Sequence, residues 1–328
     1  MESQKEYETL DNVLQNLAKY LLDNELPYIS IDEAKSFFKD YLKTRNLELE
    51  VEHLFQLLVD RTEFMLVDFE RQRIAFKHRS FTEFFYAKGC IKNHDMHVDN
   101  RAFQLYWMNV FYFYLGLLKD APGPLRELVN LEPTSEGERW LKVTNMANFF
   151  MAAYLTPYSI IEDGVTKIMQ DAAKLYVDVV SGKSASALAR LPRMHFLWVF
   201  QFLMRYSYSF GFFIPALEKA ALSIDESALE KDLKAYALFF LNVAYMDSGA
   251  GESFDFLLKA HGGDLPLDLL LAYRHESEDV KERSALMRKQ DKRLKRILKN
   301  NKALERAVEA LYKNPLRELT KETKELGA

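Results

Sequence analysis

A histidine at a strand-to-helix junction is the residue that the sequence best equips to do chemistry. His78 follows the alternating segment 73–77 and precedes Ser80 and Glu83, which have the spacing of a helix-capping box. Backbone N–H groups and the helix dipole favour anions at such a junction, so the imidazole could donate a hydrogen bond to a phosphate oxygen. From spacing alone, the simpler interpretation is a histidine that only satisfies neighbouring backbone groups.

A second candidate is a run of positive charge near the end of the sequence. Residues 281–302 contain ten Lys or Arg and two acidic residues, a local net charge of +8, against −12 for the rest of the chain. This helix could bind nucleic acid, an anionic surface or an acidic protein, or it could be a solvated face that complements the remaining charge. No aromatic residue lies between Arg288 and Lys299 to stack single-stranded bases, so nucleic acid is the least favoured partner. The predicted partner-binding residues are Lys289, Lys292, Arg293, Lys295, Arg296 and Lys299.

Catalytic and metal-binding patterns are not evident elsewhere in the sequence. His94 and His97 have i, i+3 spacing, but only Asp95 and Asp99 accompany them, so we predict no metal site. The one cysteine, Cys90, excludes an internal disulfide and a cysteine-based zinc cluster, and it fits a reducing cytosol. No Ser/His/Asp or Cys/His arrangement has local support, so we predict no catalytic residue and no enzyme activity for this chain.

A phosphate-binding loop is also missing from the sequence. The nearest match to G-x-x-x-x-G-K-[ST] is Gly182-Lys183-Ser184, where Val177 stands in place of the first glycine. This stretch follows a helical pattern rather than a strand, so we interpret Gly182 as the end of a helix. We therefore expect the chain to hold no cofactor by itself.

The composition is that of a globular protein with a substantial core. Of the 328 residues, 48% are hydrophobic and 28% are charged, and the net charge is −4. The first residues have neither the basic nor the apolar region of a signal peptide, so we expect a cytoplasmic location. Two apolar stretches, 102–118 and 194–217, contain Gln104 and Arg205, and we interpret them as buried helices rather than membrane anchors.

The first hundred residues predict a winged-helix arrangement. Three segments with helical periodicity come first, two segments with strand periodicity follow, and one more helical segment comes after them. A winged helix can bind DNA, but residues 1–99 carry a net charge of −6 and the candidate recognition helix is acidic, so DNA binding is not expected. The predicted elements are a helix over 5–23, a helix opened by the capping box Ser30–Glu33, a helix over 51–60, strands over 63–68 and 73–77, and a helix from Ser80 to about Asn93.

From residue 100 onward the pattern is helical and rich in aromatic residues, which we interpret as core rather than as a cofactor site. Ser135 with Glu138 and Ser223 with Glu226 are predicted capping boxes. No fixed repeat period is found, so we predict an irregular, solenoid-like helical stack, and the fold class as a whole is predicted to be mainly α with one small β-hairpin. The predicted helices cover 101–118, 136–155, 163–181, 193–208, 227–247, 252–261 and 266–274, with the basic helix at 281–302 and a last amphipathic turn at 316–326.

The string from residue 76 to 87 resembles the end of the winged-helix domain of NACHT-type nucleotide-binding proteins. The resemblance extends over about residues 1–95. In that family the histidine of this motif contacts the β-phosphate of bound ADP in the closed state, and the resemblance implies the same role for His78. The matching residues are Phe76, His78, Ser80, Phe81, Glu83, Phe84 and Ala87.

The resemblance implies a regulatory function rather than a catalytic one. A NACHT NTPase has its P-loop upstream of the winged helix, so this chain resembles the C-terminal part of such a protein without its NTPase module. The implied domains are a winged helix at 1–97, a helical sensor at 98–275 and basic amphipathic helices at 276–328. The implied partners are an NTPase module in cis or in trans with its ADP or ATP, a protein trigger in antiphage or innate immune defence, and further copies on oligomerisation. The alternative is a stand-alone helical adaptor that binds protein or nucleic acid through its basic C-terminal helix.

Overall fold

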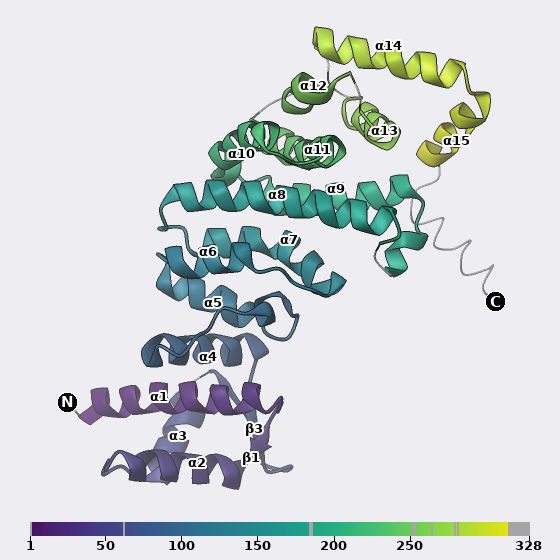
Figure 1. The fold of residues 1–328 in the computed structure, drawn as a ribbon. Helices are drawn as coiled ribbons and strands as arrows, with labels where there is room; N and C mark the ends of the chain where they lie inside the picture. Colours follow the sequence, from purple (N-terminus) through teal and green to yellow (C-terminus); the bar gives the residue numbers. More distant parts are fainter. Residues whose placement is uncertain are drawn as a thin grey trace, which may run out of the picture. The chain divides into compact units, whose positions relative to one another are not determined.

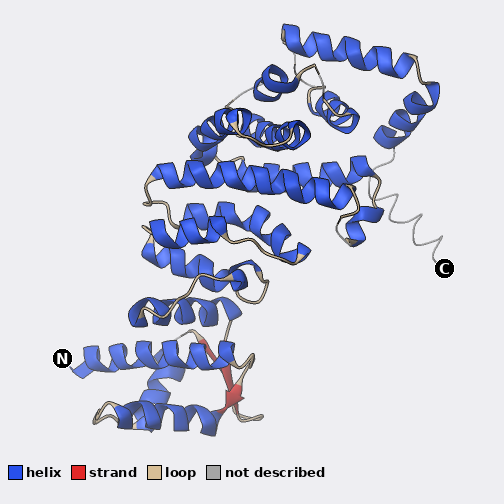
Figure 2. Cartoon of the chain, viewed as in Figure 1, coloured by secondary structure: helices blue, strands red, loops and turns tan. Residues whose placement is uncertain are grey.

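Helices make up most of the structure, as Figures 1 and 2 show, which confirms the predicted mainly α fold class with a small β-hairpin. The chain divides into a first unit, residues 1–133 and 148–157, and a second unit, residues 134–147 and 158–328. Each unit is described by itself. The structure is a computed structural model that describes residues 2–61, 63–183, 186–250, 254–263, 265–278, 280 and 282–313.

The first unit combines helices with a short sheet. Its elements are α1 (Glu2–Asp23), β1 (Ile29–Ser30), α2 (Ile31–Thr44), α3 (Val51–Arg61), β2 (Met65–Asp68), β3 (Arg73–Phe76), α4 (Arg79–Asn93), the 3-10 helix η1 (Asn100–Phe103), α5 (Met108–Leu118), α6 (Pro122–Asn130) and the end of α7 (Glu136–Ala152).

The predicted hairpin forms, and a third strand joins it. Strand β3 lies between β1 and β2 and pairs with both in antiparallel register, so that Ile74 stands opposite Ile29 and Val67. Strand β1 was not predicted, because a strand of two residues is too short to show alternation. The added strand ties the hairpin to the segment that precedes α2.

Helix α4, which follows the hairpin, packs against both α1 and α5 (Figure 1). The Lys88 ammonium lies 2.6 Å from an Asp11 carboxylate oxygen, and the Tyr86 hydroxyl donates to Asp23 at 2.9 Å. These contacts fix α4 along the length of α1. Helix α1 also contributes an apolar stripe to the core of the first unit, namely Leu10, Val13, Leu14, Leu17 and Leu21.

Two of the four predicted helix caps are confirmed. The Ser30 hydroxyl accepts from the N–H of Glu33 at 3.1 Å, and the Ser135 hydroxyl accepts from the N–H of Glu138 at 3.2 Å. The other two are wrong, because the helices begin elsewhere. Ser80 lies inside α4, which starts at Arg79, and Ser223 lies inside α10 (Ile214–Glu226).

The second unit is helical throughout its described residues. After the first part of α7 its elements are α8 (Tyr158–Val180), η2 (Ala187–Arg190), α9 (Arg193–Tyr208), η3 (Gly211–Phe213), α10 (Ile214–Glu226), α11 (Lys231–Asp247), α12 (Asp255–His261), α13 (Leu267–Glu276), α14 (Ala285–Lys299) and α15 (Lys302–Lys313).

The core of the second unit is built around α11, which contacts α8, α9, α10, α12 and α13. Aromatic rings fill the space between these helices. The Tyr176 and Phe196 rings stack with centroids 5.4 Å apart, and the Phe200 and Phe240 rings stack at 4.9 Å. The interpretation of the aromatic residues as core is therefore confirmed for these positions.

Helices α6 and α10 lie outside the predicted helical ranges, and each has a proline in its first turn. Pro122 and Pro215 lie in the first turns of α6 and α10, where a missing N–H breaks no helical hydrogen bond. Helix α9 has the bounds that were predicted for it, whereas the predicted turn at 316–326 lies outside the described residues.

The apolar stretches 102–118 and 194–217 are each divided among shorter elements. Within the described part of the chain, no helix combines the length and the apolar character needed to cross a membrane.

Candidate functional site

His78 occupies the N-cap position of α4, directly after the β2–β3 hairpin. Its backbone is extended, with φ −134° and ψ 141°, and its carbonyl accepts from the N–H of Phe81 at 3.0 Å. The imidazole is exposed, makes no capping hydrogen bond, and lies with its centroid 5.7 Å from that of the Phe81 ring. The ring is therefore accessible at a helix end that favours anions.

A buried carboxylate in α4, that of Glu83, holds the start of the helix in place. Glu83 accepts from the Nε of Arg79 at 2.9 Å and from the Nδ2 of Asn109 at 3.1 Å. The Arg79 guanidinium also lies 4.0 Å from the centroid of the Tyr106 ring and donates to the Tyr106 carbonyl at 2.7 Å. Glu83 was predicted as the partner of a capping serine. It instead attaches α4 to Asn109 of α5, and its partner Arg79 attaches α4 to Tyr106.

The predicted basic face lies on α14, whose opposite face is buried. The Ser284 hydroxyl caps the helix by accepting from the N–H of Met287 at 3.2 Å. The inward residues are Met287, Gln290 and Leu294, and the Gln290 amide donates to the carbonyl of Gly262 at the end of α12. Five of the six predicted cations are exposed, namely Lys289, Lys292, Lys295, Arg296 and Lys299, and Arg288, outside the predicted set, is exposed as well.

Arg293, the sixth predicted cation, differs from the other five. It is half-buried, and its Nη2 donates to the carbonyl of Leu265 at 3.3 Å. The acidic residue within the helix, Asp291, is paired with Arg283 at 3.0 Å and so is already engaged with a cation outside the exposed face. The five exposed cations thus form a continuous surface, called here the α14 basic face.

A buried polar cluster joins four helices of the second unit and was not foreseen. The Asp268 carboxylate of α13 accepts from the hydroxyls of Tyr176 in α8 and Tyr236 in α11, at 2.9 Å and 2.8 Å. It also accepts from the Nε of Arg193, at the start of α9, at 2.8 Å. Burial and the nearby carboxylate raise the pKa of both tyrosines, so they remain neutral hydrogen-bond donors at neutral pH. We call this cluster the Asp268 hub.

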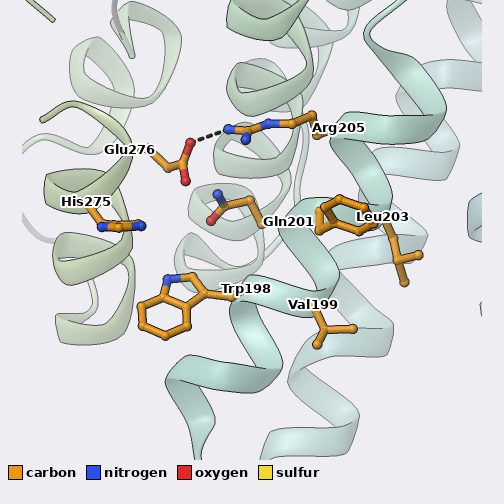
Figure 3. A pocket seen from close by; sticks show the side chains of 8 residues that line it. Trp198, Val199, Gln201, Leu203, Arg205, His275 and Glu276 are labelled. Carbon is orange, nitrogen blue, oxygen red and sulfur yellow. Dashed lines mark hydrogen bonds and ion pairs between the residues drawn. The ribbon is translucent and has the colours of Figure 1, made fainter. Parts of the chain in front are cut away.

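A cavity of about 410 Å³ opens between α9 and the end of α13 (Figure 3). The Arg205 guanidinium of α9 forms an ion pair with the Glu276 carboxylate of α13 across it. From the sequence, Arg205 was apparent only as a charge in an apolar stretch, and neither its partner nor the cavity was predicted. The cavity is lined by Trp198, Val199, Gln201, Phe202, Leu203, Arg205, His275 and Glu276.

The two histidines and the cysteine that the sequence offered as further candidates lie near the end of α4. His94 ends α4 in a left-handed conformation with φ 55°, and His97 is exposed beyond it. Burial raises the pKa of the Cys90 thiol to about 12, so the thiol stays protonated and unreactive at neutral pH. Among the residues that the structure describes, no group of three or more His, Cys, Asp or Glu side chains is arranged to hold a metal ion.

The second unit supplies the observation that decides the family. A family model described as NACHT C-terminal Helical domain 1 matches residues 148–320, which is more than half of the 328 residues. The chain belongs to this family. No curated protein and no solved structure matches the chain.

The NACHT C-terminal helical domain 1 is a non-catalytic helical region, and the match includes the Asp268 hub, the cavity and the α14 basic face. The string at 76–87 that resembles NACHT winged helices lies before the matched range. The match by itself indicates the C-terminal part of a NACHT protein, as the sequence predicted. Neither stretch tests the nucleotide contact of His78 or a partner for the α14 basic face, and both remain predictions.

The sequence contains one signal for each of the two features that were not predicted, the Asp268 hub and the cavity. In both cases the signal is a charged residue inside an apolar helix. Asp268 stands in the segment Leu267–Tyr273, which is otherwise apolar, and Arg205 stands in an aromatic helix. A charge inside such a segment is retained when it has a partner. Which partner it has depends on residues far away in the sequence, and the spacing within one helix does not reveal them.

Proposed function

We propose that this chain is the regulatory and sensing C-terminal region of a NACHT-type NTPase, with a winged-helix domain at 1–97. The observation that carries the proposal is an exposed His78 at the N-cap of α4, directly after a hairpin and within a NACHT-like string. Membership in the NACHT C-terminal helical domain 1 family supports it from a separate stretch. A role in antiphage or innate immune defence follows from the family resemblance and is part of the proposal.

In the proposed closed state, the NTPase module presents ADP to the N-terminal end of α4, in cis or in trans. The N–H groups of the first turn and the helix dipole favour the negatively charged β-phosphate, and the His78 imidazole donates a hydrogen bond to it. Because Glu83 and Arg79 attach this turn to Tyr106 and to α5, the imidazole is carried on a rigid support. A displacement of α5 would therefore withdraw the imidazole from the phosphate.

A protein trigger acts on this state through the helical stack. It binds the open conformation more tightly than the closed one, and the difference in affinity shifts the population toward nucleotide exchange and oligomerisation. The coupling between the two ligands is reciprocal. Because the trigger weakens the binding of ADP, ADP must weaken the binding of the trigger by the same factor.

The test uses the chain together with its NTPase module and compares wild type with His78→Ala. Loss of one charge-assisted hydrogen bond is expected to weaken ADP binding about tenfold and to raise trigger-free activity. His97→Ala, an exposed histidine away from the start of α4, serves as the matched control. Unchanged ADP affinity and unchanged basal activity in His78→Ala would show that the nucleotide-sensing role is wrong.

A second candidate function is a stand-alone adaptor that binds an acidic partner through the α14 basic face. The observation that favours it is the set of five exposed cations on a helix whose other face is buried. Lys292→Glu/Arg296→Glu is expected to abolish the salt-dependent binding of an acidic partner. Lys39→Glu/Lys43→Glu, an equal charge change on exposed positions of α2, is the control. Equal binding by both variants would remove the adaptor function.

A further inference from the structure

The cavity between α9 and α13 has a composition that the proposed nucleotide contact does not use. Figure 3 shows that side chains of α9 and the last two residues of α13 extend into one space. Its volume of about 410 Å³ is within the range of sites that bind small ligands or single side chains. All of its lining residues belong to the second unit.

Gln201 is the first observation that points to a ligand. Its side chain is 4% exposed, lines the cavity, and has an amide oxygen with no hydrogen-bond partner. A buried polar atom without a partner costs free energy, which a ligand with an N–H donor at this position would recover. The Gln201 amide oxygen therefore favours a ligand that donates a hydrogen bond to it.

The charges around the cavity favour a cation. Arg205 pairs with Oε2 of Glu276, and its Nε lies 3.6 Å from a carboxylate oxygen of Asp247. One guanidinium thus stands between two carboxylates, and the three groups sum to a net charge of −1. Glu276 is 14% exposed at its side chain, so a second cation beside it would be only partly screened by water.

The walls of the cavity are aromatic. The Trp198 indole lines it, and the His275 ring lies with its centroid 5.6 Å from that of the indole. A tryptophan ring attracts cations, and it attracts a planar guanidinium more effectively than an ammonium because the two flat groups can also stack.

An exposed aromatic rim adjoins the cavity on α9. Phe202 and Tyr206 are 63% and 73% exposed, and their rings stack with centroids 6.4 Å apart. Leu203, between them in sequence, is half-buried and lines the cavity with Phe202. Exposed aromatic side chains beside a concave site are typical of surfaces that bind protein segments.

We propose that this cavity binds the guanidinium of an arginine in a partner protein, and that apolar residues flanking this arginine pack on Phe202 and Tyr206. The guanidinium donates to the Gln201 amide oxygen and to Glu276, and it stacks on Trp198. Five donors in one plane suit these acceptors better than the single ammonium of lysine does. The inference rests on the proposed function only in taking this partner to be the protein trigger.

Isothermal titration of the full chain with three probes tests the proposal. The probes are the capped tripeptide Phe-Arg-Leu, the same peptide with citrulline in place of arginine, and arginine amide. Citrulline has nearly the same shape without the charge, so its peptide is expected to bind at least tenfold more weakly. Equal affinities of the arginine and citrulline peptides, or no binding of either, would overturn recognition of a guanidinium.

Arginine amide separates a protein segment from a free small molecule. The apolar flanks are expected to improve the affinity of the tripeptide at least tenfold over the amide. Tyr206→Ala, at a rim residue that does not line the cavity, is expected to reduce this advantage while the affinity for arginine amide stays unchanged. Equal affinity of the tripeptide and the amide would overturn the assignment of a protein segment and leave a free guanidinium compound as the ligand.

Two cavity variants check the acceptors. Gln201→Leu and Glu276→Gln are each expected to weaken the arginine peptide at least tenfold, whereas Glu226→Gln, at an exposed carboxylate in α10, is expected to leave it unchanged. Thermal unfolding verifies that each variant folds, and Glu276→Gln keeps the test decisive if the buried Gln201→Leu does not. These assays contain no nucleotide, so a negative result in them does not contradict the nucleotide contact of His78. A negative result for His78 likewise does not contradict recognition of a guanidinium in this cavity.

Discussion

Removal of the Asp268 carboxylate is expected to destabilise the second unit strongly. In Asp268→Ala the Tyr176 hydroxyl loses the acceptor of its proton inside the core, and the Tyr236 hydroxyl loses its acceptor while still accepting from Arg193 at 2.7 Å. A buried hydrogen-bonding group left without a partner costs about 1–3 kcal/mol. Arg193 is half-exposed and recovers most of its interaction from water. The expected loss is therefore about 3–4 kcal/mol of unfolding free energy.

Urea unfolding of the full chain measures this loss. Trp140, which packs 4.6 Å from the Phe200 ring, reports on the core of the second unit through its fluorescence. Asp268→Asn keeps one acceptor oxygen and is expected to lose about half as much as alanine. Asp255→Asn breaks an exposed ion pair with Lys259 in α12 and is expected to change stability by less than about 0.5 kcal/mol. If Asp268→Ala lost no more than this control, the reasoning about the hub would be refuted.

Three further predictions concern buried titratable groups. Burial and a hydrogen bond to Asp23 raise the pKa of Tyr86 to about 12, so the unfolding free energy should fall by about 2 kcal/mol between pH 10 and pH 12. Urea unfolding should show the difference in unfolding free energy between wild type and Tyr86→Phe becoming smaller over that range. Burial lowers the pKa of His195, so stability should fall as pH drops below 6.5, and the gap to His195→Phe should narrow there; a constant gap in either series would contradict the linkage. Glu83→Gln, which weakens the Arg79 pair, should cost about 1–3 kcal/mol in unfolding followed by Trp107 fluorescence, and no change would show that this pair does not hold α4.

Helices and strands that are determined by periodicity and turn residues within one stretch of sequence could be predicted. The apolar stripe of α1, the bounds of α9 and the β2–β3 hairpin could all be predicted because periodicity and turn residues determine them. His78 was found for the same reason, since its position between a strand and a helix is a property of a dozen consecutive residues. The structure places this residue, exposed, at the N-cap of α4, where the sequence had predicted Ser80.

Features that depend on distant partners could not be predicted. Ser80 and Glu83 have capping-box spacing, yet Glu83 turns to Asn109, which lies 26 residues away. The Asp268 hub joins residues from four helices, and its longest contact in sequence spans 92 residues, to Tyr176. Such pairings are set by how helices pack, which the spacing within one helix does not encode.

The proposed function depends most on a contact between the His78 imidazole and the β-phosphate of ADP. The most direct measurement is the nuclear magnetic resonance signal of the His78 ring in the chain assembled with its NTPase module, compared with ADP bound and with AMP bound. AMP has the same base and sugar without a β-phosphate. A ring signal that moves with ADP and stays in place with AMP is the predicted result. Identical ring signals with both nucleotides, at saturation of each, would contradict the claim.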